Sequence, residues 1–302
     1  MASESAGRMP LVVLVVGMAG TGKTTLVQRI NHFAIENDKR AYFINMDPAV
    51  VDVPFDARID IRDAVDYKDV MTKHRLGPNG AILTSLNVYA THISQVIGLV
   101  EARKDEVDYV FVDTPGQIEV FTWSASGQII TEAFASTFPT TMLFVGDTTR
   151  CVNPQTFMST MLYSSSIMYK SQLPLTIAFN KCDAADGATP VQWMRDPEAL
   201  SLALRDQKSY VATLTDSLAV FLHEFYETLQ FALVSALAGT GIEELFEGLD
   251  RAKQQYVTEF LPVIRERAAA RESEAAAAAA DQVRRLQQDM ADGDDGGAGS
   301  PS

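Results

Sequence analysis

Six short apolar runs recur along the chain, and each of them ends at polar or glycine residues. Their apolar positions are continuous instead of alternating, which indicates strands that are buried on both faces. Helical stretches lie between the runs, so the pattern predicts an α/β fold with a mostly parallel sheet flanked by helices. The predicted strands are Leu11–Val16, Ala41–Asn45, Tyr109–Val112, Thr141–Val145, Leu175–Phe179 and Phe231–Val234.

The alternation of strands and helices spans residues 9–264, which we predict to form one domain after a flexible N-terminus of residues 1–8. Two segments interrupt the alternation as helical insertions, a charged one at about 52–82 and a Met- and Tyr-rich one at about 154–173. Residues 265–302 are rich in Ala, Glu and Arg and end in an acidic stretch. This composition predicts a largely disordered tail.

Composition and charge narrow the possible functions. The 302 residues carry a formal net charge of -14, which argues against direct nucleic-acid binding because such binding needs a basic surface. The two cysteines, Cys151 and Cys182, have no metal-ligand or CxxC spacing, which suits a reducing compartment inside the cell.

Leu11–Val16 leads into a glycine-rich loop with no small-residue cleavage site, so we interpret it as a strand and not as part of a signal peptide. No apolar stretch approaches the length of a bilayer span, and we expect a soluble protein that does not use a membrane.

The segment after the first predicted strand, GMAGTGKT, matches the phosphate-binding pattern GxxxxGK[ST] in full. It opens a predicted helix at Thr25–Ile35, which is the context that this motif requires. Glycines let backbone N–H groups converge on phosphate oxygens, and the helix N-terminus adds positive potential. We expect the Lys23 ammonium to reach the β- and γ-phosphates and the Thr24 hydroxyl to bind Mg²⁺. The residues assigned to nucleotide binding here are Gly20, Thr21, Gly22, Lys23, Thr24 and Thr25.

A second motif, DTPGQ, follows the predicted strand Tyr109–Val112. An aspartate at the end of a buried strand can support the magnesium ion, and we assign this role to Asp113. Gly116 can place its backbone N–H near the γ-phosphate. The motif resembles the DxxGQ element of GTPases, which implies that Gln117 orients the attacking water.

The tetrapeptide NKCD follows the predicted strand Leu175–Phe179. The carboxylate of Asp183 can accept hydrogen bonds from both N1–H and the 2-amino group of guanine, whereas adenine offers no such pair of donors. A polar site left unpaired by the wrong base is costly, so discrimination can reach about 10⁴. We expect the stem of Lys181 to pack along the base and Asn180 to tie this loop to the phosphate loop.

The end of the sixth predicted strand, Ser235-Ala236-Leu237, resembles the SAK element of GTPases, in which a backbone N–H contacts guanine O6. Leu237 stands where a lysine is usual, so only the backbone role carries over. An ordinary strand end accounts for the same three residues equally well.

Two further features narrow the resemblance. Asn45–Ala49 (NMDPA) follows the second predicted strand, and Gly77-Pro78-Asn79 lies between the second and third. A Gly-Pro-Asn tripeptide alone is an ordinary turn. Together with DTPGQ and in this order, the elements resemble the GPN-loop GTPases, a branch of the SIMIBI-type P-loop nucleotide hydrolases. The resemblance covers about Leu11 to Leu261.

This resemblance implies two subunits that face each other across their nucleotides, with the loop Gly77–Asn79 of one subunit reaching the phosphates and attacking water of the other. We therefore assign a catalytic role to Asn79, and we assign one to Lys23 of the phosphate loop as well. Asp47 is the implied water-polarising or magnesium-linked carboxylate, and Gln117 is a second water contact. We rank Asp47 first because a carboxylate can accept a proton or hold water by its charge.

Related dimeric ATPases carry an extra lysine early in the P-loop, where this chain has Met18 and Ala19. No arginine stands at a matching point. The transition-state charge would then be met by Lys23, Mg²⁺ and backbone or partner amides.

The long C-terminal extension resembles that of the longest of three eukaryotic paralogues, which implies a role in RNA polymerase II assembly and nuclear import. The implied partners are polymerase subunits or assembly factors and a second GPN-loop GTPase, either the same chain or a paralogue. The implied location is the cytoplasm, with shuttling to the nucleus.

The Met-rich segment Pro154–Leu173 adds a hypothesis about clients. Phe157, Met161, Leu162 and Met168 could line an apolar groove that nucleotide state opens and closes, because Met-rich surfaces adapt to varied partners. A helix packed in the core or in a dimer interface explains the same pattern.

The main alternative is a P-loop kinase or ATPase that acts on a small molecule, because a P-loop alone allows phosphoryl transfer to an acceptor. NKCD and DTPGQ weigh against this alternative, since a kinase needs an acceptor pocket and a lid and has no need of a guanine reader. The sequence therefore predicts a GTP hydrolase that uses GTP/GDP and Mg²⁺ and acts as a dimeric nucleotide switch.

Overall fold

The computed structural model describes residues 9–205, 226, 229–264 and 266. A seven-stranded sheet forms its centre, with the strand order β3-β2-β4-β1-β5-β6-β7 and parallel pairing throughout. The strands are β1 (Leu11–Val16), β2 (Ala41–Asn45), β3 (Ala57–Asp60), β4 (Tyr109–Asp113), β5 (Thr140–Asp147), β6 (Leu175–Asn180) and β7 (Gln230–Leu233). The predicted α/β fold with a mostly parallel sheet is confirmed.

The segment 52–82 contains helices, as expected, and also one edge strand that was not predicted. β3 (Ala57–Asp60) lies in that segment and pairs with β2 alone, with a register shift between Phe43 and Ile44. Its four residues, ARID, are half-buried or exposed and carry two charges. An edge strand of this kind lacks the continuous apolar run that revealed the buried strands.

The Met- and Tyr-rich segment is α9 (Pro154–Ser171), the helix that crosses from β5 to β6. Parallel neighbours need such a crossover, so the segment belongs to the regular alternation, and the expectation of an insertion at 154–173 is wrong. The Asn153 side chain caps the helix by accepting hydrogen bonds from the backbone N–H groups of Gln155 and Thr156. Phe157 and Met161 are fully buried.

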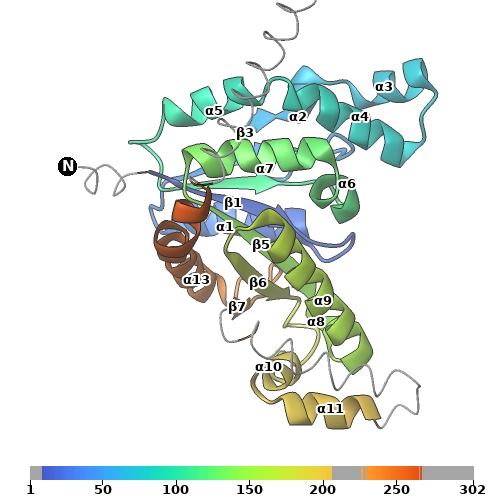
Figure 1. Ribbon diagram of the computed structural model, residues 1–302, viewed down its shortest axis with the longest axis vertical. Coiled ribbons are helices and arrows are strands. Elements are labelled where there is room, and N and C mark those ends of the chain that lie inside the picture. Colours follow the sequence, from blue (N-terminus) through green and yellow to red (C-terminus); the bar gives the residue numbers. More distant parts are fainter. Residues whose placement is uncertain (1–8, 206–225, 227–228, 265, 267–302) are drawn as a thin grey trace, which may run out of the picture. The chain divides into compact units, whose positions relative to one another are not determined.

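Helices cover both faces of the sheet. On one face, α1 (Lys23–Glu36) and α13 (Ile242–Gln255) pack against the strands, and Leu26 and Phe246 belong to this core. On the other side, α7 (Ala125–Thr137) lies with α4 (Pro78–Ala90) and α5 (Ile93–Glu101), and α9 contacts β5 (Figure 1). The remaining described helices are α2 (Ile61–Ala64), α3 (Tyr67–His74), α6 (Ile118–Thr122), α8 (Thr148–Cys151), α10 (Ala188–Arg195), α11 (Pro197–Arg205) and the π-helix η2 (Tyr256–Phe260).

The chain divides into two compact units, Met1–Phe260 and Leu261–Ser302. The structure describes only residues 261–264 and 266 of the second unit, and they are helical. The predicted flexible N-terminus and nearly all of the predicted tail lie outside the described residues. In the part of the chain that is described, no helix has the length and apolarity that crossing a bilayer would require.

The strand order explains where a ligand can bind. β1 lies between β4 and β5, at the point where the chain moves from one half of the sheet to the other. Ligands of open parallel sheets bind beyond the carboxyl ends of the strands at such a point. The motifs that follow β1, β2, β4, β6 and β7 therefore meet at one edge of the sheet.

Candidate nucleotide-binding site

The loop after β1 has the conformation of a phosphate cradle. Gly20 and Gly22 adopt left-handed backbone angles, with φ of 81° and 87°, and Gly22 caps the N-terminus of α1. A side chain at Gly22 would place its Cβ 2.6 Å from Nδ2 of Asn180, so glycine is required there by space as well as by angle. Thr21 is buried and bonds back to the Met18 carbonyl at 2.9 Å.

The side chain of Lys23 is buried inside this loop. Its Nζ donates to the carbonyl oxygens of Gly17 at 2.7 Å and Met18 at 3.2 Å. Burial lowers the pKa of Lys23, while the nearby carboxylates of Asp113 and Asp47 oppose this shift. The ammonium is thus held at the mouth of the phosphate loop, as the sequence predicts. Thr25, by contrast, is exposed on the first turn of α1.

Thr24 and Asp113 meet as predicted, although 89 positions separate them in the sequence. The Thr24 hydroxyl donates to Oδ2 of Asp113 at 2.8 Å. Burial raises the pKa of Asp113 to about 7, and the Thr24 bond and the Lys23 charge only partly offset this. Oδ1 of Asp113 is buried and has no hydrogen-bond partner among the described residues.

These features fit a divalent cation. A cation near Asp113 would give the orphaned oxygen a partner and would favour the ionised carboxylate. No group of three or more His, Cys, Asp or Glu side chains suited to a metal occurs in the described part of the chain. A divalent cation bound here would be held largely by phosphates and water, with Thr24 and Asp113 as protein support.

Asp47 connects two of the predicted motifs. Its Oδ2 accepts from the backbone N–H of Gly116 at 3.2 Å, and its Oδ1 accepts from Ala49 at 2.9 Å. Asn45 at the end of β2 fixes the loop by accepting from Asp47 N at 3.1 Å. Gln117 is half-buried and begins α6 without capping it through its side chain.

The loop after β6 is tied to the phosphate loop by Asn180, as the sequence predicts. Its Nδ2 donates to the Thr21 carbonyl at 2.9 Å, and its Oδ1 accepts from the backbone N–H groups of Ala236 at 3.0 Å and Lys181 at 2.9 Å. One buried amide thus joins the loops that follow β1, β6 and β7.

Sequence reasoning missed Asp147, which ends β5. Its Oδ2 accepts from Lys181 Nζ at 2.7 Å, and the same ammonium donates to the Gly20 carbonyl at 2.7 Å. Asp147 is only 6% exposed. Its position at a strand end, the feature that singled out Asp113, was the available signal, but no motif surrounds it.

Asp183 and Ser235 come together in the base-reading loops. The Ser235 hydroxyl donates to Oδ1 of Asp183 and accepts from the backbone N–H of Ala238. Asp183 itself is exposed, so its carboxylate is open to a ligand. Leu237 is 77% exposed, which suits a backbone role and not a packing role.

The structure does not bring Gly77, Pro78 and Asn79 to these residues by any hydrogen bond within the described ranges. Gly77 caps α4 and Pro78 is its first residue, where a missing N–H costs nothing. All three residues are exposed. The Tyr67 hydroxyl donates to the Pro78 carbonyl at 3.4 Å, and the Ala81 N–H donates to the Gly77 carbonyl at 3.0 Å.

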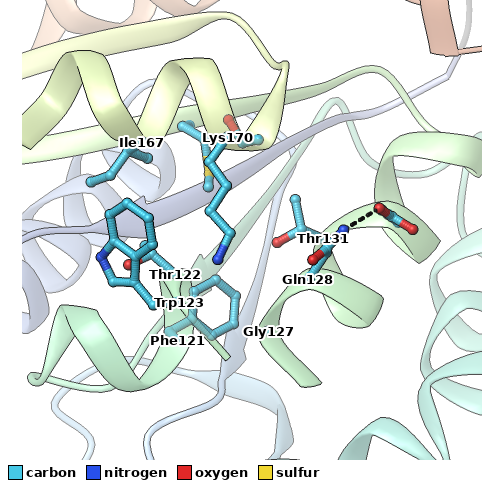
Figure 2. Close-up of a pocket in the computed structure, with 11 residues that line it drawn as sticks. Phe121, Thr122, Trp123, Gly127, Gln128, Thr131, Ile167 and Lys170 are labelled. Carbon is cyan, nitrogen blue, oxygen red and sulfur yellow. Dashed lines mark hydrogen bonds between the residues drawn. The ribbon is translucent and has the colours of Figure 1, made fainter. Parts of the chain in front are cut away.

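A small hollow opens beside the DTPGQ element, between α6 and α7 on one side and α9 on the other (Figure 2). Phe121 and Trp123 line it from α6 and the turn after it, and Ile167 and Lys170 line it from α9. Lys170 Nζ lies 4.7 Å from the centre of the Trp123 ring, and Trp123 Nε1 donates to the Tyr163 hydroxyl at 3.0 Å. The predicted groove along Phe157 and Met161 is not accessible, because both residues are core.

Sequence comparisons find relatives over most of the chain. A family model described as a conserved hypothetical ATP binding protein matches residues 15–255. GPN-loop GTPase QQT2 of Arabidopsis thaliana is 51% identical over 80% of this chain and 64% of its own length. GPN-loop GTPase 1 of Dictyostelium discoideum is 52% identical over 82% of this chain and 63% of its own length. The chain thus spans slightly less than two thirds of the length of these two relatives.

Two further comparisons extend the likeness. A crystal structure of PAB0955, a GTPase in apo form from Pyrococcus abyssi, shares 24% identity at a TM-score of 0.71, covering 82% of this chain and 98% of that one. At this identity the likeness shows the fold alone. GPN-loop GTPase 1 of Schizosaccharomyces pombe is 42% identical over 84% of this chain and 72% of its own length. With the family match, these relatives show that the chain belongs to the GPN-loop GTPase family.

Proposed function

We propose that this protein binds GTP and hydrolyses it to GDP and phosphate, as a nucleotide switch. The observation that carries this proposal is the exposed carboxylate of Asp183, which accepts a hydrogen bond from Ser235 and follows Asn180, the residue that ties this loop to the phosphate loop. A carboxylate can accept from N1–H and the 2-amino group of guanine, and adenine has no such donors. The base reader therefore favours GTP over the ATP named in the family description.

The phosphates bind at the loop Gly17–Thr24 in this proposal. Lys23 has two of its three donors on loop carbonyls and a third left for a phosphate oxygen. Thr24 and Asp113 would hold Mg²⁺, which neutralises charge on the β- and γ-phosphates when it is bound. Asp113 accepts the Thr24 hydroxyl hydrogen bond and would support the ion through its buried carboxylate.

Asp47 acts on the γ-phosphate side. Both of its oxygens already accept backbone hydrogen bonds, so we assign it first to holding the Gly116 N–H in place and second to polarising water. Gln117, which follows Gly116 in the sequence, contacts the same water. This arrangement couples the loop after β2 to the DTPGQ element, which is the part that would sense whether the γ-phosphate is present.

The exposed position of Asn79 supports a dimer in which the loop Gly77–Asn79 completes the site of a second subunit. The second subunit is the same chain or a paralogous GPN-loop GTPase. By resemblance, we further propose that its partners are RNA polymerase II subunits or assembly factors and that it acts in their assembly and nuclear import, in the cytoplasm with shuttling to the nucleus.

A client-binding role of the chaperone kind would use the hollow between α6, α7 and α9. Trp123 is 48% exposed there, and α6 begins directly after Gln117, so a change at the γ-phosphate would reach the hollow through one short helix. Binding of a tryptophan-quenching apolar peptide in the presence of GDP and of a non-hydrolysable GTP analogue tests this role. Equal affinity in both states would contradict a nucleotide-controlled groove.

The hydrolysis itself is tested by phosphate release from GTP and from ATP, with Mg²⁺ and no added acceptor. We expect release from GTP at a much higher kcat/KM than from ATP, and none after chelation of Mg²⁺. Equal use of ATP would contradict the guanine assignment. A requirement for a small-molecule acceptor would favour the kinase alternative.

A further inference from the structure

Arg29 lies in the middle of α1, outside every motif of the sequence, yet it contacts the base-reading loop. Its Nε donates to the Ala236 carbonyl at 3.0 Å, and its Nη2 donates to the Leu237 carbonyl at 2.8 Å. The side chain also packs over Gly239, whose left-handed backbone, with φ of 80°, keeps the turn open. The same helix begins at Lys23 in the phosphate loop, so one rigid element touches both ends of the site.

Across the four residues 236–239, the described hydrogen bonds leave one backbone N–H without an acceptor. The N–H of Ala236 donates to Asn180 Oδ1, that of Ala238 to Ser235 Oγ, and that of Gly239 to the Ser235 carbonyl at 2.8 Å. Among the described residues, the N–H of Leu237 donates to no group. A polar backbone group without a partner in an otherwise satisfied turn is available to a ligand.

The Ala236 carbonyl and the Leu237 N–H belong to the same peptide unit. In a trans peptide these two groups point in opposite directions, so a bond that fixes the carbonyl also fixes the N–H. A charged donor on the carbonyl polarises the unit and strengthens its N–H as a donor. Arg29 does both to the N–H of Leu237.

We propose that Arg29 is a positioning residue for guanine selectivity: it orients the Ala236–Leu237 peptide so that the Leu237 N–H donates to guanine O6. The inference rests on the proposed function and divides the base reading between two sets of groups. Asp183 reads the N1–H and 2-amino edge, and the Arg29-held peptide reads O6. The arginine supplies from α1 the support that a lysine at position 237 would otherwise provide.

The affinities for three nucleotides, GDP, inosine diphosphate and 6-thioguanosine diphosphate, distinguish this role from a general structural one. Inosine diphosphate lacks the 2-amino group but keeps O6, and 6-thioguanosine diphosphate keeps both donors but replaces O6 with sulfur, a weaker acceptor. Dissociation constants for these two and for GDP are measured with Mg²⁺ for the wild type and Arg29→Met. Methionine has a similar length and helix propensity and donates no hydrogen bond.

We expect the preference of the wild type for GDP over 6-thioguanosine diphosphate to fall by about threefold to tenfold in Arg29→Met, the value of one hydrogen bond. The preference for GDP over inosine diphosphate stays unchanged. Arg29→Lys covers the case in which Arg29→Met fails to fold, since a single ammonium cannot hold both carbonyls in the fork geometry. It should show a smaller loss of the same preference.

Arg40→Met is the matched control. Arg40 also donates several side-chain hydrogen bonds, two to the exposed Asp108 carboxylate and one to the Asp105 carbonyl, but it lies before β2 at the opposite end of the strands. The Arg40→Met substitution removes the same charge from a chain of net charge -14 and should alter neither preference.

Loss of affinity for all three nucleotides by one factor, or no loss, in the Arg29 variants would overturn the inference. A wild type that prefers ADP to GDP would instead overturn the proposed function, and the inference with it.

Discussion

At the scale of single residues, the site is held by side chains that each bond to more than one loop. Asn180 joins three loops through one amide, and Lys181 bonds to both Gly20 and Asp147. Asp183 differs, because its only protein partner in the described residues is Ser235 and its carboxylate faces solvent. Asn180 and Lys181, whose side chains bond to several loops, position the site, whereas the exposed carboxylate of Asp183 is available to bind the base.

Replacing Asp183 by alanine should therefore abolish the preference for GTP and leave the fold intact. Loss of two charge-assisted hydrogen bonds to the base should reduce GTP affinity by about 10²-fold or more, while ATP affinity stays as weak as before. Dissociation constants for both nucleotides measure this, with thermal unfolding as the check on the fold. If the variant still binds GTP in preference to ATP, Asp183 is not the guanine reader.

The ion pair between Asp147 and Lys181 should make stability depend on pH. Burial acts to raise the pKa of Asp147, but the hydrogen bonds from Lys181 and Thr149 outweigh it, and the pKa lies below its ordinary value of 3.8. The stabilisation is fully present above that ordinary value and is lost as pH falls through the lowered pKa. Asp147→Asn should reduce the free energy of unfolding by about 1–2 kcal/mol at neutral pH.

Urea unfolding of the wild type and Asp147→Asn at neutral pH and at a series of values below the ordinary carboxyl pKa tests this dependence. The difference between the two proteins should shrink towards zero at the acid end. Asp108→Asn, which removes the exposed ion pair with Arg40, is the control and should change the free energy of unfolding much less at every pH, because solvent screens an exposed pair. A constant difference for Asp147→Asn across the series would show that the ion pair does not contribute through its charge.

At the scale of elements, the phosphate loop and α1 form one unit whose geometry depends on two glycines. Gly20 and Gly22 have similar positive φ angles, but their surroundings differ. A Cβ at Gly20 would meet no atom within 4 Å, whereas a Cβ at Gly22 would meet Asn180 Nδ2 at 2.6 Å. The pair therefore separates backbone strain from crowding.

Gly20→Ala and Gly22→Ala should both lose stability, by about 1–2 kcal/mol for the left-handed backbone. Gly22→Ala should lose more nucleotide affinity, about tenfold further, because displacing Asn180 breaks the bond to Thr21 and frees the loop after β6. Unfolding free energies and GDP affinities of both variants decide the matter. Equal effects would mean that the Asn180 contact does not organise the phosphate loop.

At the scale of the whole molecule, Asn79 is exposed, and no hydrogen bond within the described residues joins it to the nucleotide site. If the loop acts on a second subunit, Asn79→Ala should bind nucleotide normally and hydrolyse it at least about 10²-fold more slowly. Lys23→Ala should also be inactive, because its own site cannot hold the phosphates. The two defects then lie in different subunits of a mixed dimer.

Mixing the two inactive variants should restore turnover, to about a quarter of the wild-type rate per subunit for random pairing at equal amounts. The intact site of the Asn79→Ala subunit would receive the intact loop of the Lys23→Ala subunit. Phosphate release from each variant alone and from the mixture provides the measurement. Mixed dimers that form but stay inactive would contradict a loop that acts between subunits.

The buried strands could be predicted from the sequence because burial on both faces leaves a continuous apolar run. Five of the six predicted runs lie within observed strands. The Phe231–Val234 run differs by one residue at each end, as β7 spans Gln230–Leu233. β3 was missed because an edge strand needs no such run. α9 was interpreted as an insertion because its buried Met and Phe residues resemble a partner surface until the sheet that covers them is known.

By itself, the sequence located the phosphate loop, the pair Thr24 and Asp113, and the loop after β6, because each belongs to a local motif at a strand end. Only the tertiary structure decided which distant residues complete the site. Arg29 reaches Ala236 across 207 positions and Asp147 reaches Lys181 across 34. Such contacts leave no local pattern, since the sheet order and not chain distance brings them together.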